Sequence, residues 1–201
     1  KKFGRWDRIR FHWRRPRDDT RLESRRIDQE TLSIIGKSKK TDRENLLRKM
    51  VVTSLDRERE KGHSLALLQA EFIEFYFEKK SAESMAEDTA KFQALRAQAD
   101  LFSAQPLVPY SPAPYRFKYR YRTDDGVRDG TCQDWEIEWT FMKWSKKYGE
   151  DETLVKMTEI FAELYPEKGM LFAMGTHSRY PDVWLINGII RLDEIKQLSL
   201  L

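Results

Sequence analysis

The sequence predicts an α+β fold: a small antiparallel sheet packed by helices, preceded by a strand-plus-helical region and a Pro-rich connector. Residues 115–122 alternate aromatic and cationic side chains, as a strand with one buried face does. Several other stretches space apolar residues three and four apart, which indicates amphipathic helices. Two short, continuously apolar runs near the carboxyl end are typical of strands covered on both faces.

Another alternating segment lies near the amino end. It reads Arg8, Ile9, Arg10, Phe11, His12, Trp13, Arg14. This pattern predicts a strand with one apolar and one basic face. A second apolar run, Leu32 to Ile35, ends at Gly36 and predicts a partner for it. We therefore expect a small strand pair at the start of the chain.

Three helices are predicted before the connector. The first is capped by Thr41 or Asp42 and ends at Gly62. The second begins at Ser64 and has apolar residues at helical spacing, and the third covers residues 81–103. The apolar residues of the second are Leu65, Leu68, Phe72, Phe75 and Tyr76.

The connector is predicted at Gln105 to Pro114, where four of the seven prolines fall within nine residues. Proline excludes helix and favours a stiff, extended chain. The sequence is thus divided into a basic strand and helical region (1–104), the connector (105–114) and an α+β module (115–201).

In the last module the cationic strand ends at a turn, Asp124 to Gly126, and a helix opens near Gln133 and ends at Gly149. This helix is apolar over more than half of its circumference, which predicts burial on two sides. A second helix over 151–165 and strands over 170–174 and 183–192 follow.

Charge is distributed unevenly along the chain. Residues 1–26 contain eleven Lys or Arg against four acids, a balance of +7, although the whole chain carries only +4. A basic arm of this kind concentrates near phosphates. We therefore expect a non-catalytic nucleic-acid-binding accessory module whose partner is DNA or RNA, within a larger protein complex. The same cations also serve, in many proteins, to keep exposed strands from aggregating.

The candidate phosphate contacts lie on the two alternating segments and on the polar loop 175–182, whose His and Arg side chains suit phosphate binding. They are Arg8, Arg10, Arg14, Arg116, Lys118, Arg120, Arg122, His177 and Arg179. Tyr or Trp rings at the margin of the sheet would stack on unpaired bases.

Two alternatives remain open. Asp134, Glu138 and His177 would serve a metal-dependent nuclease, although Asp134 at the start of a helix also suits a cap. A protein-interaction scaffold would instead dock a partner on the charged region 42–100. Neither the spacing of a zinc site nor a phosphate-cradling glycine loop occurs, so no cofactor and no metal are expected.

The single cysteine, Cys132, indicates a reducing compartment, and no apolar run is long enough to cross a membrane. We therefore expect a cytoplasmic protein without membrane association.

The cationic strand, the triplet Asp134–Trp135–Glu136 and the Gly175–Thr176–His177 loop together resemble a recurrent module of uncharacterised prokaryotic proteins. The upstream Ile34–Gly36 and the helix expected around Phe72 to Lys79 are similar too, so the resemblance covers most of the chain. It implies a prokaryotic, intracellular origin and no established activity. Members of that family carry Cys and His before the triplet, whereas only Cys132 occurs here.

Overall fold

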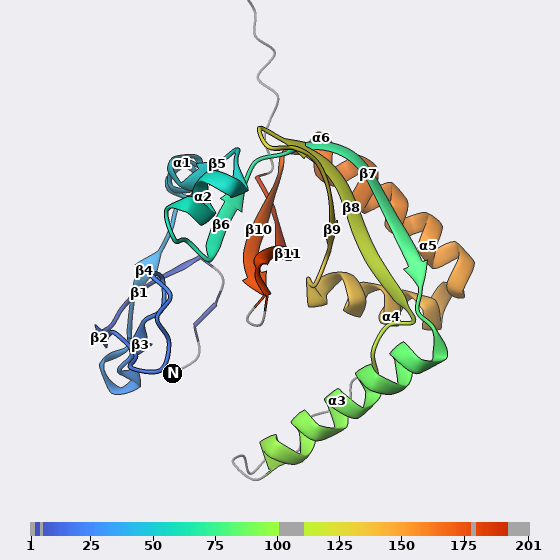
Figure 1. The fold of residues 1–201 in the computed structure, drawn as a ribbon, viewed down its shortest axis with the longest axis horizontal. Helices are drawn as coiled ribbons and strands as arrows, with labels where there is room; N and C mark the ends of the chain where they lie inside the picture. The colour runs from blue at the N-terminus through green and yellow to red at the C-terminus, as the bar shows by residue number, and fades with distance from the viewer. Residues whose placement is uncertain (1–2, 5, 101–110, 178–179, 193–201) are drawn as a thin grey trace, which may run out of the picture.

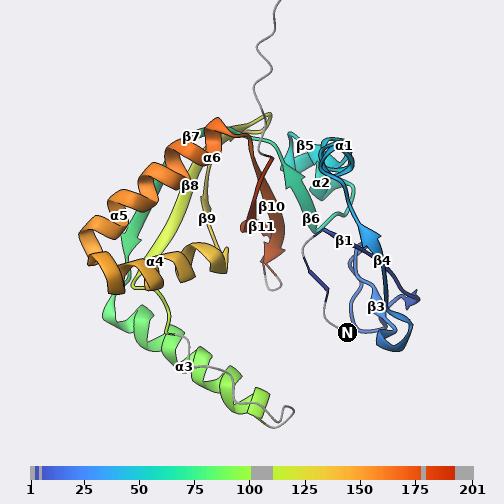
Figure 2. The same cartoon turned by 180° about the vertical axis from the view of Figure 1, so that it is seen from behind.

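The computed structural model describes residues 3–4, 6–100, 111–177 and 180–192, and it has the α+β fold that the sequence predicts. Small sheets, mostly antiparallel, pack against helices (Figure 1). Both views show strands β1 to β4 at one end of the molecule, α4 and α5 near the other, and α3 projecting away from the sheets (Figures 1 and 2). None of the helices in the described residues has the length and apolarity needed to span a bilayer.

The elements follow in the order β1 (Asp7–Arg10), β2 (Trp13–Arg14), β3 (Arg26–Ile27), η1 (Gln29–Thr31), β4 (Ser33–Lys37), α1 (Lys40–Met50), β5 (Val51–Val52), α2 (Leu55–Glu60), β6 (Leu65–Leu68), β7 (Glu71–Lys79), α3 (Ala82–Asp100), β8 (Tyr115–Thr123), β9 (Gly126–Thr131), α4 (Trp135–Tyr148), α5 (Glu150–Thr158), η2 (Glu159–Leu164), α6 (Tyr165–Glu167), β10 (Met170–His177) and β11 (Tyr180–Arg191).

Strand β8 lies in the middle of a three-stranded antiparallel sheet, between β7 and β9. Its alternation has the predicted effect, because the aromatic residues point into the core while Arg116, Arg120 and Arg122 are exposed. The buried rings, each at most 7% exposed, are Tyr115, Phe117, Tyr119 and Tyr121. The predicted turn at 124–126 leads directly into β9, a strand that the sequence analysis does not predict.

The aromatic face of β8 contacts two other parts of the chain. Phe141 of α4 lies 5.9 Å from Phe117, between ring centroids. Phe172 of β10 lies 5.1 Å from Tyr119 and 5.2 Å from Tyr121. Tilted aromatic pairs of this kind contribute about 0.5–1.5 kcal/mol each beyond the area that they bury. The cationic strand is therefore also the centre of the hydrophobic core.

A second sheet has the order β11–β10–β6–β5, in which β5 pairs parallel with β6 and the other pairs are antiparallel. Strands β6 and β7 precede the predicted connector, and their partners β10 and β8 follow it. Both sheets thus join segments from either side of residues 105–114. Of the connector only 111–114 lies within the described residues, and the domain boundaries remain a prediction.

Strand β7 occupies a stretch where the sequence analysis, including the resemblance around Phe72 to Lys79, predicts a helix. That prediction is wrong. A bulge between Phe72 and Glu74 shifts the alternation by one residue, so that Phe72, Phe75 and Phe77 all pack against the core. The three-residue step across the bulge imitates the spacing of a helix.

The first predicted helix is divided into α1 and α2 by the short strand β5, and β6 lies where the second helix is expected to begin. The third predicted helix is confirmed as α3. The predicted helix 151–165 corresponds to α5, the π-helical turn η2 and α6, and the two carboxyl-terminal strands are confirmed as β10 and β11.

Helix α4 is buried along one stripe only. Ile137 and Phe141 are at most 2% exposed, whereas Trp135 is 64% and Trp139 is 50% exposed. The predicted burial on two sides is therefore wrong. Only the flank that carries Phe141 meets the rings of β8.

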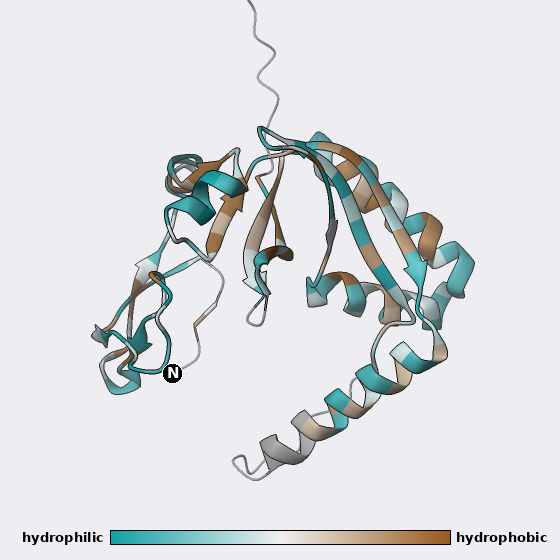
Figure 3. Ribbon diagram, in the orientation of Figure 1, coloured by the Kyte–Doolittle hydropathy of each residue, from teal (hydrophilic) through white to brown (hydrophobic). Residues whose placement is uncertain are grey.

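Residues 6–37, here called the N-terminal module, carry strands β1 to β4. Strand β1 pairs antiparallel with β4, and β2 pairs with β3, so the predicted strand pair is confirmed. The His12 amide donates to Thr31 Oγ1 at 2.8 Å, and the His12 carbonyl accepts from the Asp28 amide at 2.9 Å. The module is mostly hydrophilic, whereas β6 beside it carries hydrophobic residues (Figure 3).

The packing between the two sheets predicts different effects of alanine at two strand glycines. A Cβ at Gly130 would lie 2.8 Å from Ile186 Cδ1 and 3.0 Å from Tyr121 Cε1, whereas at Gly188 the nearest side-chain atom would be 3.7 Å away. We expect Gly130→Ala to lower the free energy of unfolding by about 1–3 kcal/mol, because the core must move. Gly188→Ala is the matched control and should change it little. Urea denaturation measures both, and equal effects would contradict this view of the core.

Candidate functional site

The cations on the outer face of β8 are held by neighbouring side chains. The pairs are Lys118 Nζ with Glu78 Oε1 at 2.9 Å, Arg120 Nη1 with Glu74 Oε2 at 3.1 Å, Arg120 Nε with Asp129 Oδ1 at 3.1 Å, and Arg122 Nη1 with Glu71 Oε2 at 3.1 Å. Arg116 Nη2 donates to Ser84 Oγ at 2.7 Å. The ion pair with Glu78 raises the pKa of Lys118.

Strand register explains this pairing. Antiparallel pairing of β7 with β8 places Glu71 opposite Arg122, and Glu74 opposite Arg120. Exposed ion pairs contribute only about 0–1 kcal/mol each to stability, but they cancel charge locally. A phosphate that approached β8 would have to compete with carboxylates already bound. The role of these cations in binding nucleic acid therefore stays a prediction.

Tyr76 completes this outer face. Its ring lies 5.5 Å from Lys118 Nζ and 5.7 Å from Arg120 Cζ, and its hydroxyl donates to Asp129 Oδ1 at 2.8 Å. Burial, together with this hydrogen bond, raises the pKa of Tyr76. The face is a satisfied network of cations, carboxylates and one aromatic ring.

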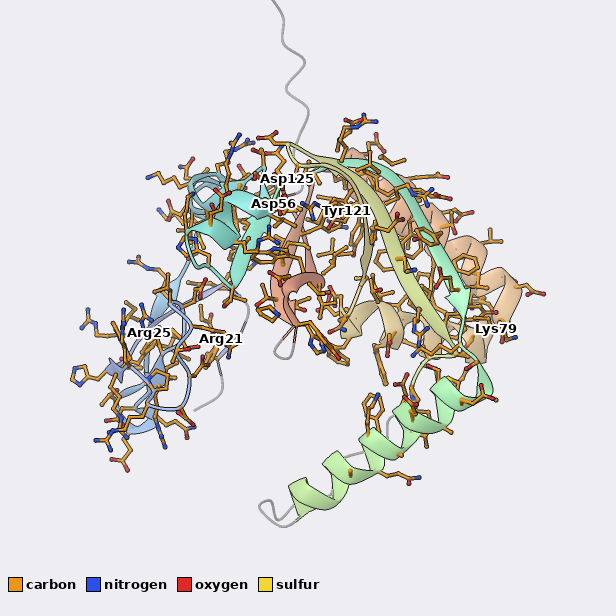
Figure 4. The ribbon with its side chains drawn as sticks, in the orientation of Figure 1. Arg21, Arg25, Asp56, Lys79, Tyr121 and Asp125 are labelled. Carbon is orange, nitrogen blue, oxygen red and sulfur yellow. The ribbon has the colours of Figure 1, made fainter. Side chains whose placement is uncertain are left out.

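The N-terminal module has a different electrostatic character. Besides Arg21 and Arg25, six of its arginines are exposed, and none of the six forms an ion pair within the part of the chain that the structure describes. They are Arg8, Arg10, Arg14, Arg15, Arg17 and Arg26. In Figure 4 the side chains of the module extend outward around Arg21 and Arg25, which are labelled. Arg21 forms an ion pair with Asp19, and Arg25 donates to the carbonyl groups of Leu22 and Ser24.

Alternation places part of this set on one surface. Arg8 and Arg10 of β1 are exposed on the same face, with Ile9 turned the other way and half-buried. Arg14 of β2 lies directly opposite Arg26 of β3. Short strand pairs thus bring together cations that are up to twelve positions apart in the sequence.

Charge is distributed unevenly along the chain, and the module itself, residues 6–37, contains nine Lys or Arg against six Asp or Glu, a balance of +3. Residues 1–50 contain seventeen Lys or Arg against eight Asp or Glu, a balance of +9, so the remaining residues carry −5. A field of this kind attracts a polyanion to one end of the molecule.

Two side chains of the module contact the second sheet and its surroundings: Trp6 packs against the cluster of Leu47, Leu67 and Leu171, and Glu23 binds the start of β6. Glu23 accepts hydrogen bonds from the Ser64 amide at 2.7 Å, the Leu65 amide at 3.1 Å and Ser64 Oγ at 3.0 Å. Burial alone would raise the pKa of Glu23, but these hydrogen bonds outweigh it and lower the pKa. Strand β6, which begins at Leu65, is therefore the support of the module.

The predicted loop 175–182 is largely part of the strands β10 and β11. His177 ends β10, and its ring lies 5.1 Å from that of Tyr180. Arg179 lies outside the described residues. These two candidate phosphate contacts come from the hairpin that ends the second sheet, not from the N-terminal module.

The acids of the nuclease alternative have structural roles. Asp134 caps α4, because its Oδ1 accepts from the Glu136 amide at 2.9 Å and its Oδ2 from the Ile189 amide at 2.9 Å. The predicted cap is confirmed. Glu138 lies 3.8 Å from Lys80 Nζ. Among the described residues, no three His, Cys, Asp or Glu side chains are grouped so that they could hold a metal.

Cys132, the single thiol of the chain, is buried. Burial raises the pKa of the Cys132 thiol to about 12, which favours the protonated thiol over the nucleophilic thiolate at neutral pH.

Some residues of the basic surface are not individually predicted from the sequence. Arg15, Arg17 and Arg26 enter the sequence analysis only through the charge count of residues 1–26, although the run Arg14–Arg15 and the neighbouring Arg17 are a visible signal. Trp13 is expected on the apolar face of a strand, but it is 51% exposed.

A family model described as a domain of unknown function (DUF8757) matches residues 21–200. The chain belongs to this family. No curated protein and no solved structure matches the chain. Membership in DUF8757 agrees with the resemblance to an uncharacterised family and assigns no activity. The match begins inside the N-terminal module, so Arg8, Arg10 and Arg14 precede it.

The double hydrogen bonding of Asp134 predicts a graded loss of stability. Asp134→Ala removes the cap of α4 and leaves the Ile189 amide without its acceptor, which should cost about 1–3 kcal/mol of unfolding free energy. Asp134→Asn keeps one acceptor oxygen and should cost less. Thermal and urea denaturation measure both variants. If Asp134→Ala were as stable as the wild type, the structural role would be refuted.

The Glu23 contact predicts an acid-sensitive attachment of the module. Because its folded-state pKa is lowered, the contact stabilises the folded protein above the unfolded pKa of Glu, about 4.3, and this contribution is lost as the pH falls through the folded value. Hydrogen exchange of the Ser64 and Leu65 amides should accelerate, relative to amides of β8, over that acidic range.

Glu23→Gln is the control, because an amide oxygen still accepts hydrogen bonds but does not titrate in this range. A variant whose exchange follows the same pH profile as the wild type would show that Glu23 is not responsible.

Proposed function

We propose that this protein binds nucleic acid without catalysis, as an accessory module of a larger assembly, and that it contacts phosphates through the arginines of the N-terminal module. One observation carries the proposal. Six exposed arginines, four of them on the short strands β1 to β3, form no ion pair within the described residues.

Arginine is the side chain best suited to this role. Its planar guanidinium donates two parallel hydrogen bonds to a phosphate and keeps its charge at every physiological pH. Exposed cations without carboxylate partners retain that capacity in full. Phosphate contacts are independent of base sequence, so this chemistry serves DNA and RNA alike.

The contrast with β8 selects the N-terminal module as the main contact surface. On β8 three of the four cations are bound to carboxylates of β7 and β9, and the fourth to Ser84. In the N-terminal module only Arg21 has such a partner among the described residues, and Arg8, Arg10 and Arg14 have none. The balance of +3 over the module, within a balance of +9 over residues 1–50, supports the same assignment.

A salt titration tests the proposal. Each phosphate contact adds about 0.7 to the slope of log K against log salt for single strands and about 0.9 for duplex DNA. The triple variant Arg8→Ala/Arg10→Ala/Arg14→Ala should therefore bind a labelled oligonucleotide more weakly and lower the slope by roughly 2–3. Fluorescence anisotropy between about 50 and about 200 mM salt gives both quantities.

The matched control removes the same number of charges from the paired face, as Lys118→Ala/Arg120→Ala/Arg122→Ala. It should lower the slope much less, because those cations are engaged by carboxylates. An unchanged slope in the N-terminal variant, or a larger effect in the β8 variant, would contradict the assignment. Failure of the wild type to bind any oligonucleotide would refute the function itself.

A further inference from the structure

Trp13 is the exposed aromatic ring within the arginine surface. It belongs to β2 and keeps 51% of its surface exposed. The guanidinium of Arg25 lies over the ring, with Cζ 4.3 Å from the ring centroid. Arg25 itself is fixed, because its Nη1 donates to the Leu22 carbonyl at 2.6 Å and the Ser24 carbonyl at 2.8 Å.

Backbone pairing holds the ring in place as well. Trp13 lies opposite Ile27 in the β2–β3 pair, and the preceding residue, His12, is bonded to Thr31 and Asp28. The ring therefore sits on a paired strand and is supported by a guanidinium that two carbonyl groups orient. An aromatic side chain that is already ordered loses little conformational entropy when it binds a ligand.

Two cations without carboxylate partners in the described residues lie beside this ring along the strand pair, on the opposite face from the ring. Arg14 follows it in β2, and Arg26 lies opposite Arg14 in β3. Phosphate binding alone requires no exposed tryptophan. Alternation of cations with an open aromatic ring is the arrangement by which proteins bind single strands, the cations following the backbone while the ring stacks on a base.

We infer that Trp13 is a stacking platform for an unpaired base, and that the N-terminal module takes single-stranded DNA or RNA in preference to duplex. The inference rests on the proposed function. Bases in a duplex are stacked on one another and offer no free face, whereas an unpaired base adds its stacking on Trp13 to the phosphate contacts of the arginines. The guanidinium of Arg25 stacks on one face of the Trp13 ring, and the base would stack on the other face.

The experiment compares three labelled probes of equal length: a single-stranded oligonucleotide, the same backbone without bases, and a duplex. The wild type should bind the first roughly 5- to 100-fold more tightly than the second, the range expected for one stacked base. Trp13→Ala should bind the single strand as weakly as the abasic probe, while its affinity for the abasic probe stays unchanged. Trp13→Phe, which keeps a smaller ring, should fall between the two.

Trp135→Ala is the control, because Trp135 is also exposed, at 64%, but lies on α4, outside the N-terminal module. It should bind all three probes as the wild type does. Circular dichroism checks that each variant is folded. If Trp13→Ala does not fold, Trp13→Phe still tests the role of the ring.

The outcomes separate the two proposals. Equal affinity of the wild type for all three probes, unchanged in Trp13→Ala, would overturn the stacking platform and leave the phosphate contacts standing. An absence of binding to every probe would refute the proposed function together with the platform.

Discussion

The antiparallel pairing of β7 with β8 is the constraint on which the rest of the structure depends. It gives each strand two faces, one of carboxylates and cations and one of aromatic rings. A slip of one residue would turn the rings toward water and bring charges into the core, so the register is strongly specified. The bulge in β7 is part of this arrangement, because it returns Phe75 and Phe77 to the same side as Phe72.

This pairing also decides where charge remains available. The carboxylates of β7 and β9 engage cations that would otherwise form a continuous basic face. The N-terminal module contains six acids against nine Lys or Arg, and one of them, Glu23, binds the Ser64 and Leu65 amides instead of an arginine. Within the described residues, the module therefore presents arginines without ion-pair partners apart from the core around β8.

Local patterns predict a good part of this structure. Alternation predicts β8, the spacing of apolar residues predicts α3 and α4, and the acid before Trp135 predicts the helix cap. Local patterns do not reveal features that depend on contacts between distant parts of the chain. The partners Glu71 and Arg122 are 51 positions apart, so no local pattern shows that the cations of β8 are paired. The bulge hides the alternation of β7, and the position of α4 at one flank of the sheet leaves Trp135 exposed.

For the site, the charge count of residues 1–26 indicates the basic surface, but it does not separate paired from unpaired arginines. The strand pairing that brings Arg14 and Arg26 together becomes visible only in three dimensions. The excess of positive charge before residue 51 and of negative charge after it has an orientational consequence. A polyanion would attract the basic N-terminal end of the molecule and repel the more acidic remainder, so the protein would bind it end-on.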